Sequence, residues 1–163
     1  MAGMISHHAQ AIVMSRLAPT HDASPSLLIL SARIINAQQD EIALMQQWLR
    51  ERNQPVPEAR PVPMKMVHDG VEHEMMMPGM LTDAQLKELE AAKGKEFDRL
   101  FLRYMIQHHQ GAVLMVKELL GKGGAAMDET VFKMASDINV DQETEIKRMQ
   151  QMLFALLTEK SSQ

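Results

Sequence analysis

Apolar residues recur every three or four positions along most of the chain, a spacing typical of helices with one buried face. The pattern predicts four long helices, from the start of the chain to about Leu17, from Pro25 to about Arg52, from about Lys95 to Leu120, and from about Asp128 to Leu157. Ser24 supplies an N-cap before Pro25. Thr82 to Gln85 read as a capping box, which predicts a short helix ending near Ala92. No segment alternates strictly with period two, so we predict no strands.

The stretch between the second and third long helices interrupts this pattern. Five of the seven prolines fall between Gln54 and Met80, which forbids a continuous helix there. We therefore expect a single all-α domain over residues 1–163, a four-helix bundle made of two antiparallel hairpins. Hairpin one covers residues 1–52, a long Met-rich crossover covers 53–94, and hairpin two covers 95–157, with a turn at Gly121 to Gly124.

The two hairpins carry the same motifs. Met4-Ile5-Ser6-His7-His8 returns as Met105-Ile106-Gln107-His108-His109, and each copy runs on to a methionine, Met14 or Met115. Gln38-x-x-Glu41-Ile42-x-x-Met45 returns as Gln142-x-x-Glu145-Ile146-x-x-Met149. The sequence therefore predicts one helical hairpin repeated twice, each copy with paired histidines and spaced methionines.

Helical geometry places polar residues of both motifs on apolar faces. At about 100° per residue, His8 and His109 fall on the apolar stripe and His7 and His108 fall at its edge. The same helical angles place Gln38 and Gln142 on the inward face, with Glu41 and Glu145 at its edge. Burying an unpaired imidazole or amide costs about 1–3 kcal/mol. These groups need partners, which are one another, the nearby carboxylates, water or a metal ion.

Methionine is the outlier of the composition, at 16 of 163 residues, with only four Phe, one Tyr and one Trp. A flexible side chain that fills an irregular core explains most helical methionines taken singly. It does not explain six methionines in the polar crossover, unless some fold back as an apolar lid. Thioether and imidazole together suit Cu(I). On this basis Met105, His108 and His109, which share one helix surface, could hold an ion together.

The remaining composition excludes several classes of protein. A net charge of −4 argues against a nucleic-acid partner, and no apolar run is long enough for a membrane span. The absence of cysteine excludes disulfides, zinc–thiolate sites, iron–sulfur clusters and covalent haem. No basic and apolar leader precedes the first motif, so we expect that a leader was removed or that the N-terminus is truncated.

The motifs resemble the family catalogued as domain of unknown function 305, which includes copper-binding proteins of the CopM type. The resemblance covers nearly the whole chain and rests on both repeated motifs, on Met77-Pro78-Gly79-Met80, and on the run from Glu96 to Ala112. It implies a ferritin-like four-helix bundle, exported to the periplasm or cell surface, with a role in copper binding and resistance. In the second copy Asp98 precedes the motif, whereas the first copy has no room for that stretch. We therefore expect the better-formed bundle site in the second copy.

The leading hypothesis is a copper-binding protein without catalytic activity, which buffers or carries Cu(I) and has a copper-transfer protein as a candidate partner. The helical ligand candidates are Met4, His7, His8, Met14, Met45, Met105, His108, His109, Met115 and Met149. The crossover candidates are Met64, Met66, His68, His73, Met75, Met76, Met77 and Met80.

Three alternatives stay open on the sequence. A di-metal carboxylate oxidase is disfavoured because no Glu-x-x-His motif occurs. A b-type haem bundle would use His8 or His109 with Met45 or Met149 as axial ligands, and the same residues fit it. In a bundle without metal, the His, Gln and Glu layer would only fix the register of the helices.

Overall fold

The computed structural model describes residues 1–68, 71–121 and 128–159, with the backbone alone for residues 64–68, 71–74 and 159. Its elements are α1 (Ala2–Ser15), a 3₁₀ turn η1 (Ala18–Thr20), α2 (Pro25–Glu51), β1 (Met64–His68), β2 (Val71–Met75), α3 (Asp83–Ala91), α4 (Gly94–Gly121) and α5 (Glu129–Glu159). The turn expected at Gly121 to Gly124 falls mostly outside the described residues. No helix in the described ranges is both long enough and apolar enough to cross a membrane.

Local sequence signals set the helix starts. The Ser24 hydroxyl accepts from the backbone N–H of Leu27 at the start of α2. The capping box at Thr82 is complete, because its hydroxyl accepts from the Gln85 backbone N–H while the Gln85 side chain accepts from the Thr82 backbone N–H. Both predicted caps are confirmed. The first helix ends at Ser15, two residues before the predicted end, and η1 follows it.

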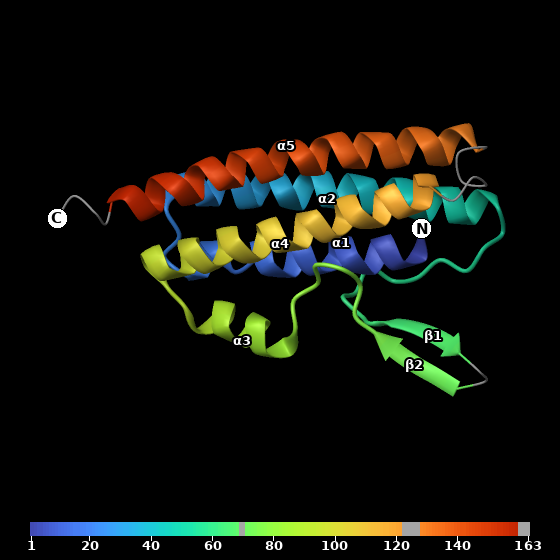
Figure 1. Cartoon of the computed structure of the whole chain (residues 1–163), viewed down its shortest axis with the longest axis horizontal. Coiled ribbons are helices and arrows are strands. Elements are labelled where there is room, and N and C mark those ends of the chain that lie inside the picture. Colours follow the sequence, from blue (N-terminus) through green and yellow to red (C-terminus); the bar gives the residue numbers. More distant parts are fainter. Residues whose placement is uncertain (69–70, 122–127, 160–163) are drawn as a thin grey trace.

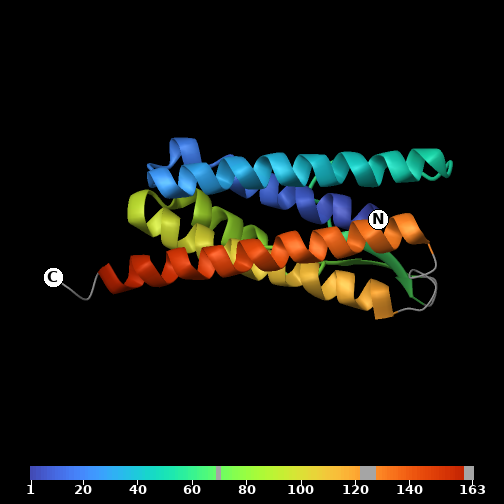
Figure 2. The same ribbon diagram turned by 90° about the horizontal axis from the view of Figure 1, so that it is seen from above.

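The four long helices pack as two pairs, α1 with α2 and α4 with α5 (Figure 1). The helices of each pair run antiparallel, and the pairs meet mainly where α1 contacts α4. In Figure 1, α2 and α5 form the layer away from α3 and the two strands, and in the view from above these two helices lie in front (Figure 2). The all-α class and the paired packing of the helices are confirmed.

The crossover contains a β-hairpin, so the prediction of no strands is wrong. β1 and β2 are antiparallel, with Met64 opposite Met75 and Met66 opposite His73. The segment from Val71 to Met75 places glutamate at every second position, which is the alternation that the sequence reading overlooked. The Asp-Gly dipeptide between the strands, which favours a two-residue hairpin turn, was a second signal.

A short strap from Met77 to Leu81 ties the crossover to the contact between α1 and α4. A Cβ added at Gly111 would lie 1.9 Å from the Pro78 carbonyl oxygen, so only glycine allows this approach. Gly79 has φ +79°, and a Cβ added there would lie 2.6 Å from the Gln107 carbonyl oxygen of α4. Gln10 donates to the Leu81 carbonyl oxygen over 3.0 Å and accepts from the Leu81 N–H over 2.7 Å. The strap is thus fixed by main-chain contacts.

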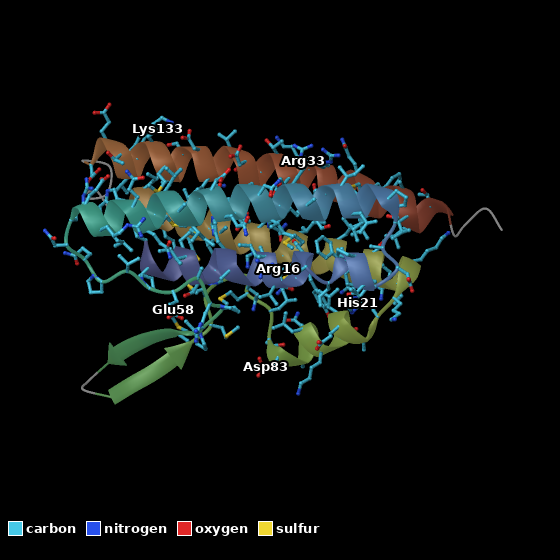
Figure 3. The ribbon with its side chains drawn as sticks, turned by 180° about the vertical axis from the view of Figure 1, so that it is seen from behind. Arg16, His21, Arg33, Glu58, Asp83 and Lys133 are labelled. Carbon is cyan, nitrogen blue, oxygen red and sulfur yellow. The ribbon has the colours of Figure 1, made fainter. Side chains whose placement is uncertain are left out.

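His21 joins the opposite end of the crossover to the first hairpin (Figure 3). Its Nδ1 lies 2.7 Å from the Leu17 carbonyl oxygen and its Nε2 lies 2.8 Å from the Glu90 carbonyl oxygen. Its own carbonyl accepts from the Gly94 N–H over 2.9 Å. The end of α3 is therefore held against the turn that follows α1.

A polar layer divides the apolar core into two halves. One half is centred on Phe97 and Phe101, and the other contains Met4, Ile42 and Met45. Between them each long helix contributes buried or half-buried polar side chains, namely His7 and His8 on α1, Gln38 and Glu41 on α2, His108 and His109 on α4, and Gln142 and Glu145 on α5. The inward positions predicted for His8, His109 and both glutamines are confirmed.

Candidate metal centre

Two histidines of the polar layer each face a glutamate from the neighbouring helix of the same hairpin. His109 Nε2 donates to Glu145 Oε2 over 2.6 Å. His8 Nε2 lies 2.7 Å from Glu41 Oε2, an ion-pair distance, although the two atoms lack the alignment of a hydrogen bond. Both imidazoles are fully buried, and the glutamate side chains are 12% and 16% exposed. Each of the two hairpins therefore contains a buried histidine within 2.7 Å of a glutamate from its neighbouring helix.

The other two histidines meet between α1 and α4. The ring centroids of His7 and His108 are 3.9 Å apart and their planes are tilted by 38°. His7 Nε2 donates to the Pro78 carbonyl oxygen over 2.9 Å, and His108 Nε2 donates to the His7 carbonyl oxygen over 3.0 Å. Both rings are buried, whereas the helical arithmetic placed them at the edge of the apolar stripe. Helical angles within one helix cannot account for burial by the opposite helix and by the strap, which cover these two rings.

Burial keeps this second pair of imidazoles neutral. It lowers the pKa of His7 to about 3, and the neighbouring His8 acts in the same direction. The pKa of His108 also lies well below its ordinary value, first because of burial and then because of the other three histidines. A neutral imidazole is the form that ligates a metal ion.

Each of the four histidines leaves at least one ring nitrogen without a hydrogen-bond partner among the described residues, and His8 leaves both. The Nδ1 atoms of His7, His8, His108 and His109 are buried and accept or donate no hydrogen bond among the described residues. The side-chain oxygens of Gln38 and Gln142 are also buried without a partner in this part of the chain. Buried polar groups in proteins are normally satisfied, so this concentration in one layer needs an explanation.

A methionine-lined cavity of about 470 Å³ lies in the half of the core that contains Met4 and Met45. Met4 lies one helical turn before His7 on α1, and Met45 lies one turn after Glu41 on α2. Seven methionines line the cavity, Met1, Met4, Met45, Met75, Met77, Met115 and Met134. The strap supplies Met77, and Met75 ends strand β2. Segments far apart in sequence thus bring thioethers together around one cavity, and its lining includes Pro78, whose carbonyl oxygen accepts from His7.

The repeat distributes its methionines over both halves of the core. Met4, Met45 and Met115 line the cavity. Their counterparts in the repeat are Met105, Met149 and Met14, and these three lie in the half that contains Phe97 and Phe101. They are fully buried there. Two methionine triplets related by the repeat therefore flank the polar layer, and the open cavity is on the side of the first.

The remaining predicted ligands differ in placement. Met76 is exposed, and Met80 is buried in the strap without lining the cavity. Met64, Met66, His68 and His73 lie on the two strands, but their side chains are outside the described part. The sequence reading missed Met1 and Met134 as lining residues, because neither belongs to a repeated motif.

Asp98 is not part of this centre, which corrects the expectation that it favours the second copy. Both of its carboxylate oxygens accept from the Ser24 backbone N–H over 3.2 Å, at the start of α2. The His109 carboxylate partner is Glu145, and the first copy has the equivalent Glu41. Within the described ranges no three His, Asp or Glu residues form a ready-made metal site.

A family model for a domain of unknown function (DUF305) matches residues 1–153 of the chain. The chain belongs to the DUF305 family. A DUF305 protein from Streptomyces coelicolor, whose name describes it as a secreted protein, is 27% identical with a TM-score of 0.78, over 95% of this chain and 88% of that chain. A DUF305 fragment from Deinococcus radiodurans is 29% identical with a TM-score of 0.76, over 93% of this chain and 91% of that chain.

The same fold occurs in CopM, which has been solved with copper and with silver. CopM in the Cu(I)-bound form is 31% identical with a TM-score of 0.67, over 91% of this chain and 89% of that chain. CopM in the Cu(II)-bound form is 32% identical with a TM-score of 0.69, over 94% and 93% of the two chains. No curated protein sequence matches this DUF305 chain.

Proposed function

We propose that this protein binds copper as Cu(I) in the methionine-lined cavity beside the histidine layer, and that it buffers or carries the ion without catalysing a reaction. The seven thioethers around one cavity carry this proposal. Thioether sulfur is a soft, neutral ligand that prefers Cu(I) to harder cations. The copper- and silver-bound forms of CopM support the same metal class.

The histidine layer would complete the ligand set. Its Nδ1 atoms are buried without partners, and a metal ion would satisfy them. Pro78, whose carbonyl oxygen accepts from His7, lines the cavity. A cation in an apolar cavity is costly to desolvate, and neutral donors on every side reduce that cost. A monovalent ion needs less compensation than a divalent one, which is a second reason to propose Cu(I).

The β-hairpin is well placed to capture the ion. By register, Met64, Met66 and His68 occupy the same face as His73 and Met75. Lysine, valine and glutamate take the alternate positions. Met75, which ends strand β2, lines the cavity, so the hairpin reaches the cavity at this residue. We infer that the hairpin collects Cu(I) and passes it inward.

The proposed copper binding is consistent with a particular fold, location and partner for the protein. We infer that the two hairpins are copies of one unit in a ferritin-like bundle, and that the protein works in the periplasm or another extracytoplasmic space. A relative described as secreted supports that location. A copper-transfer protein would be the partner that supplies or receives the ion.

A competition titration of Cu(I) against a coloured chelator tests the proposal. The variant Met4→Leu, Met45→Leu, Met115→Leu removes three cavity thioethers with little change in volume. The control is Met105→Leu, Met149→Leu, Met14→Leu, which changes the matching residues in the other half. We expect affinity well tighter than micromolar for the wild type and the control, and at least a tenfold loss for the cavity variant.

A bundle without metal is the competing function, and one observation favours it. His109 already donates to Glu145, and His8 lies at ion-pair distance from Glu41, so part of the layer has partners without an ion. Wild-type affinity no tighter than micromolar, or equal affinities for both triple variants, would support that function and reject the copper site.

A further inference from the structure

The four buried histidines share one orientation relative to their acceptors. In every ring Nε2 lies within 3.0 Å of an oxygen atom and Nδ1 has no partner, although at His8 the close approach of Nε2 to Glu41 lacks hydrogen-bond alignment. For His7 and His108 the oxygen belongs to a main-chain carbonyl. For His8 and His109 it belongs to a glutamate. Four rings on two helices therefore follow the same rule.

This arrangement determines where the proton lies. A carbonyl oxygen cannot donate, so Nε2 of His7 and His108 must carry the hydrogen. An ionised carboxylate is also only an acceptor, so Nε2 of His109 carries the hydrogen as well. The Glu41 carboxylate, 2.7 Å from Nε2 of His8, favours the hydrogen on the same atom of that ring. A second proton on Nδ1 would bury an N–H group without an acceptor, at a cost of about 1–3 kcal/mol for each ring. Each ring is thus left with a lone pair on Nδ1.

We propose that Glu41 and Glu145 are positioning residues, which hold His8 and His109 in the Nε2–H tautomer and so make Nδ1 the metal-binding atom of each ring. The ligand role rests on the proposed copper function, but the tautomer does not. In metal sites the non-ligating N–H of a histidine usually donates to a carboxylate or a carbonyl, which orients the ring and raises its basicity. In the polar layer, a carboxylate lies beside Nε2 of His8 and His109, and a main-chain carbonyl lies beside Nε2 of His7 and His108.

The two kinds of support make two kinds of ligand. A carboxylate next to Nε2–H increases electron density on Nδ1 more than a neutral carbonyl does. His8 and His109 should therefore be the stronger donors, and His7 and His108 the weaker ones. Since the repeat places one of each kind in each hairpin, the layer contains two equivalent half-sites.

Nitrogen-15 NMR of the metal-free protein tests the tautomers directly, because long-range correlations identify which ring nitrogen carries the proton. We expect Nε2–H and unprotonated Nδ1 for all four histidines. Glu41→Gln keeps an acceptor oxygen and should preserve the His8 tautomer, whereas Glu41→Leu should give a mixture. Glu145→Gln and Glu145→Leu should do the same at His109. Glu143→Gln, on the same helix but paired with Lys117, should change neither.

Silver titration then tests the ligand role. On adding Ag(I), the resonance of Nδ1 rather than Nε2 should shift, and the two leucine variants should lose about 10- to 100-fold in Ag(I) affinity. Nδ1–H or doubly protonated rings at His8 and His109 in the wild type would overturn the proposal even if a leucine variant fails to fold. Silver on Nε2 would overturn it too. Correct tautomers without Ag(I) binding would leave the positioning role intact and reject the copper function.

Discussion

His7 and His108 stack with ring centroids 3.9 Å apart, although 101 positions separate them in the chain. The contact joins the two hairpins, because each ring belongs to the first motif of its own copy. His108 donates to the main-chain carbonyl of His7, so the stack also fixes the positions of the two helix backbones. The neutrality of this pair has a direct consequence for stability.

Stability should fall as the pH decreases from about 6.5 to 5. The pKa of His7 is lowered to about 3 by burial, and that of His108 is lowered in the same direction. In this range the unfolded chain binds protons that the folded protein does not, so acid favours unfolding. Each such proton contributes about 1.4 kcal/mol per pH unit. Urea unfolding at several pH values measures the slope.

Carboxylates with ordinary pKa values take up protons mostly below pH 5, so they contribute little to the slope of the unfolding free energy between pH 6.5 and 5. His7→Gln is the control, since its amide still provides a donor for the Pro78 carbonyl while removing one titrating group. We expect a shallower slope for this variant. A free energy of unfolding that stays constant between pH 6.5 and 5 would show that the histidine pair is not held neutral.

Gly111→Ala should release the strap. Alanine normally stabilises a helix interior relative to glycine by up to about 1 kcal/mol. Here the new Cβ would lie 1.9 Å from the Pro78 carbonyl oxygen, so we expect a net loss of about 1–3 kcal/mol and faster proteolysis near the strap. Gly121→Ala, where nothing lies within 4 Å of the added atom, is the matched control. Equal thermal stabilities for the two variants would contradict the close contact.

Asp98→Ala should weaken the fold without affecting copper. The change leaves the Ser24 N–H without its buried acceptor, which costs about 1–3 kcal/mol. Thermal unfolding and the Cu(I) competition titration together check this prediction. A tenfold loss of copper affinity in a folded Asp98→Ala protein would place this carboxylate in the metal centre after all.

The sequence is sufficient to predict the faces of the helices in the polar layer. Helical angles place His8, His109 and both glutamines inward, and the structure agrees. Those angles use only residues of one helix, so they work where burial depends on one helix face. They fail for His7 and His108, whose cover comes from another helix and from the strap.

Helical angles of single helices cannot predict the methionine-lined cavity. It forms only because the strap brings Met77 onto the first hairpin and because α5 places Met134 beside Met45. Neither contact leaves a periodic signal in the chain. Met4 and Met105 hold equivalent positions in the recurring motif. Met4 nevertheless lines the open cavity, whereas Met105 is packed in the other half of the core.

Asp141→Asn should stabilise the protein slightly at neutral pH. Partial burial raises the pKa of Asp141, and the carboxylates of Glu41, Glu145 and Asp137 raise it further. The ionised group therefore costs stability above its folded pKa, and this cost disappears as the pH falls below the ordinary aspartate value. Because the side chain is largely exposed, we expect a gain of about 0.5 kcal/mol or less.

Chemical denaturation at pH 7 and pH 4 measures this gain. Glu143→Gln removes a charge from the same helix but breaks an ion pair with Lys117, so it should not stabilise. A destabilised Asp141→Asn protein at pH 7 would mean that Asp141 makes a favourable interaction, and that the carboxylates do not repel one another as the structure indicates.

The most direct test of the account is the position of a bound soft ion. Silver can be soaked into crystals of the protein and located by its anomalous scattering. We predict a strong peak inside the cavity, within bonding distance of thioethers such as those of Met4, Met45 and Met77, on the side that faces the histidine layer. Silver found only at exposed methionines, with the cavity and the layer empty at full loading, would contradict the proposed copper site.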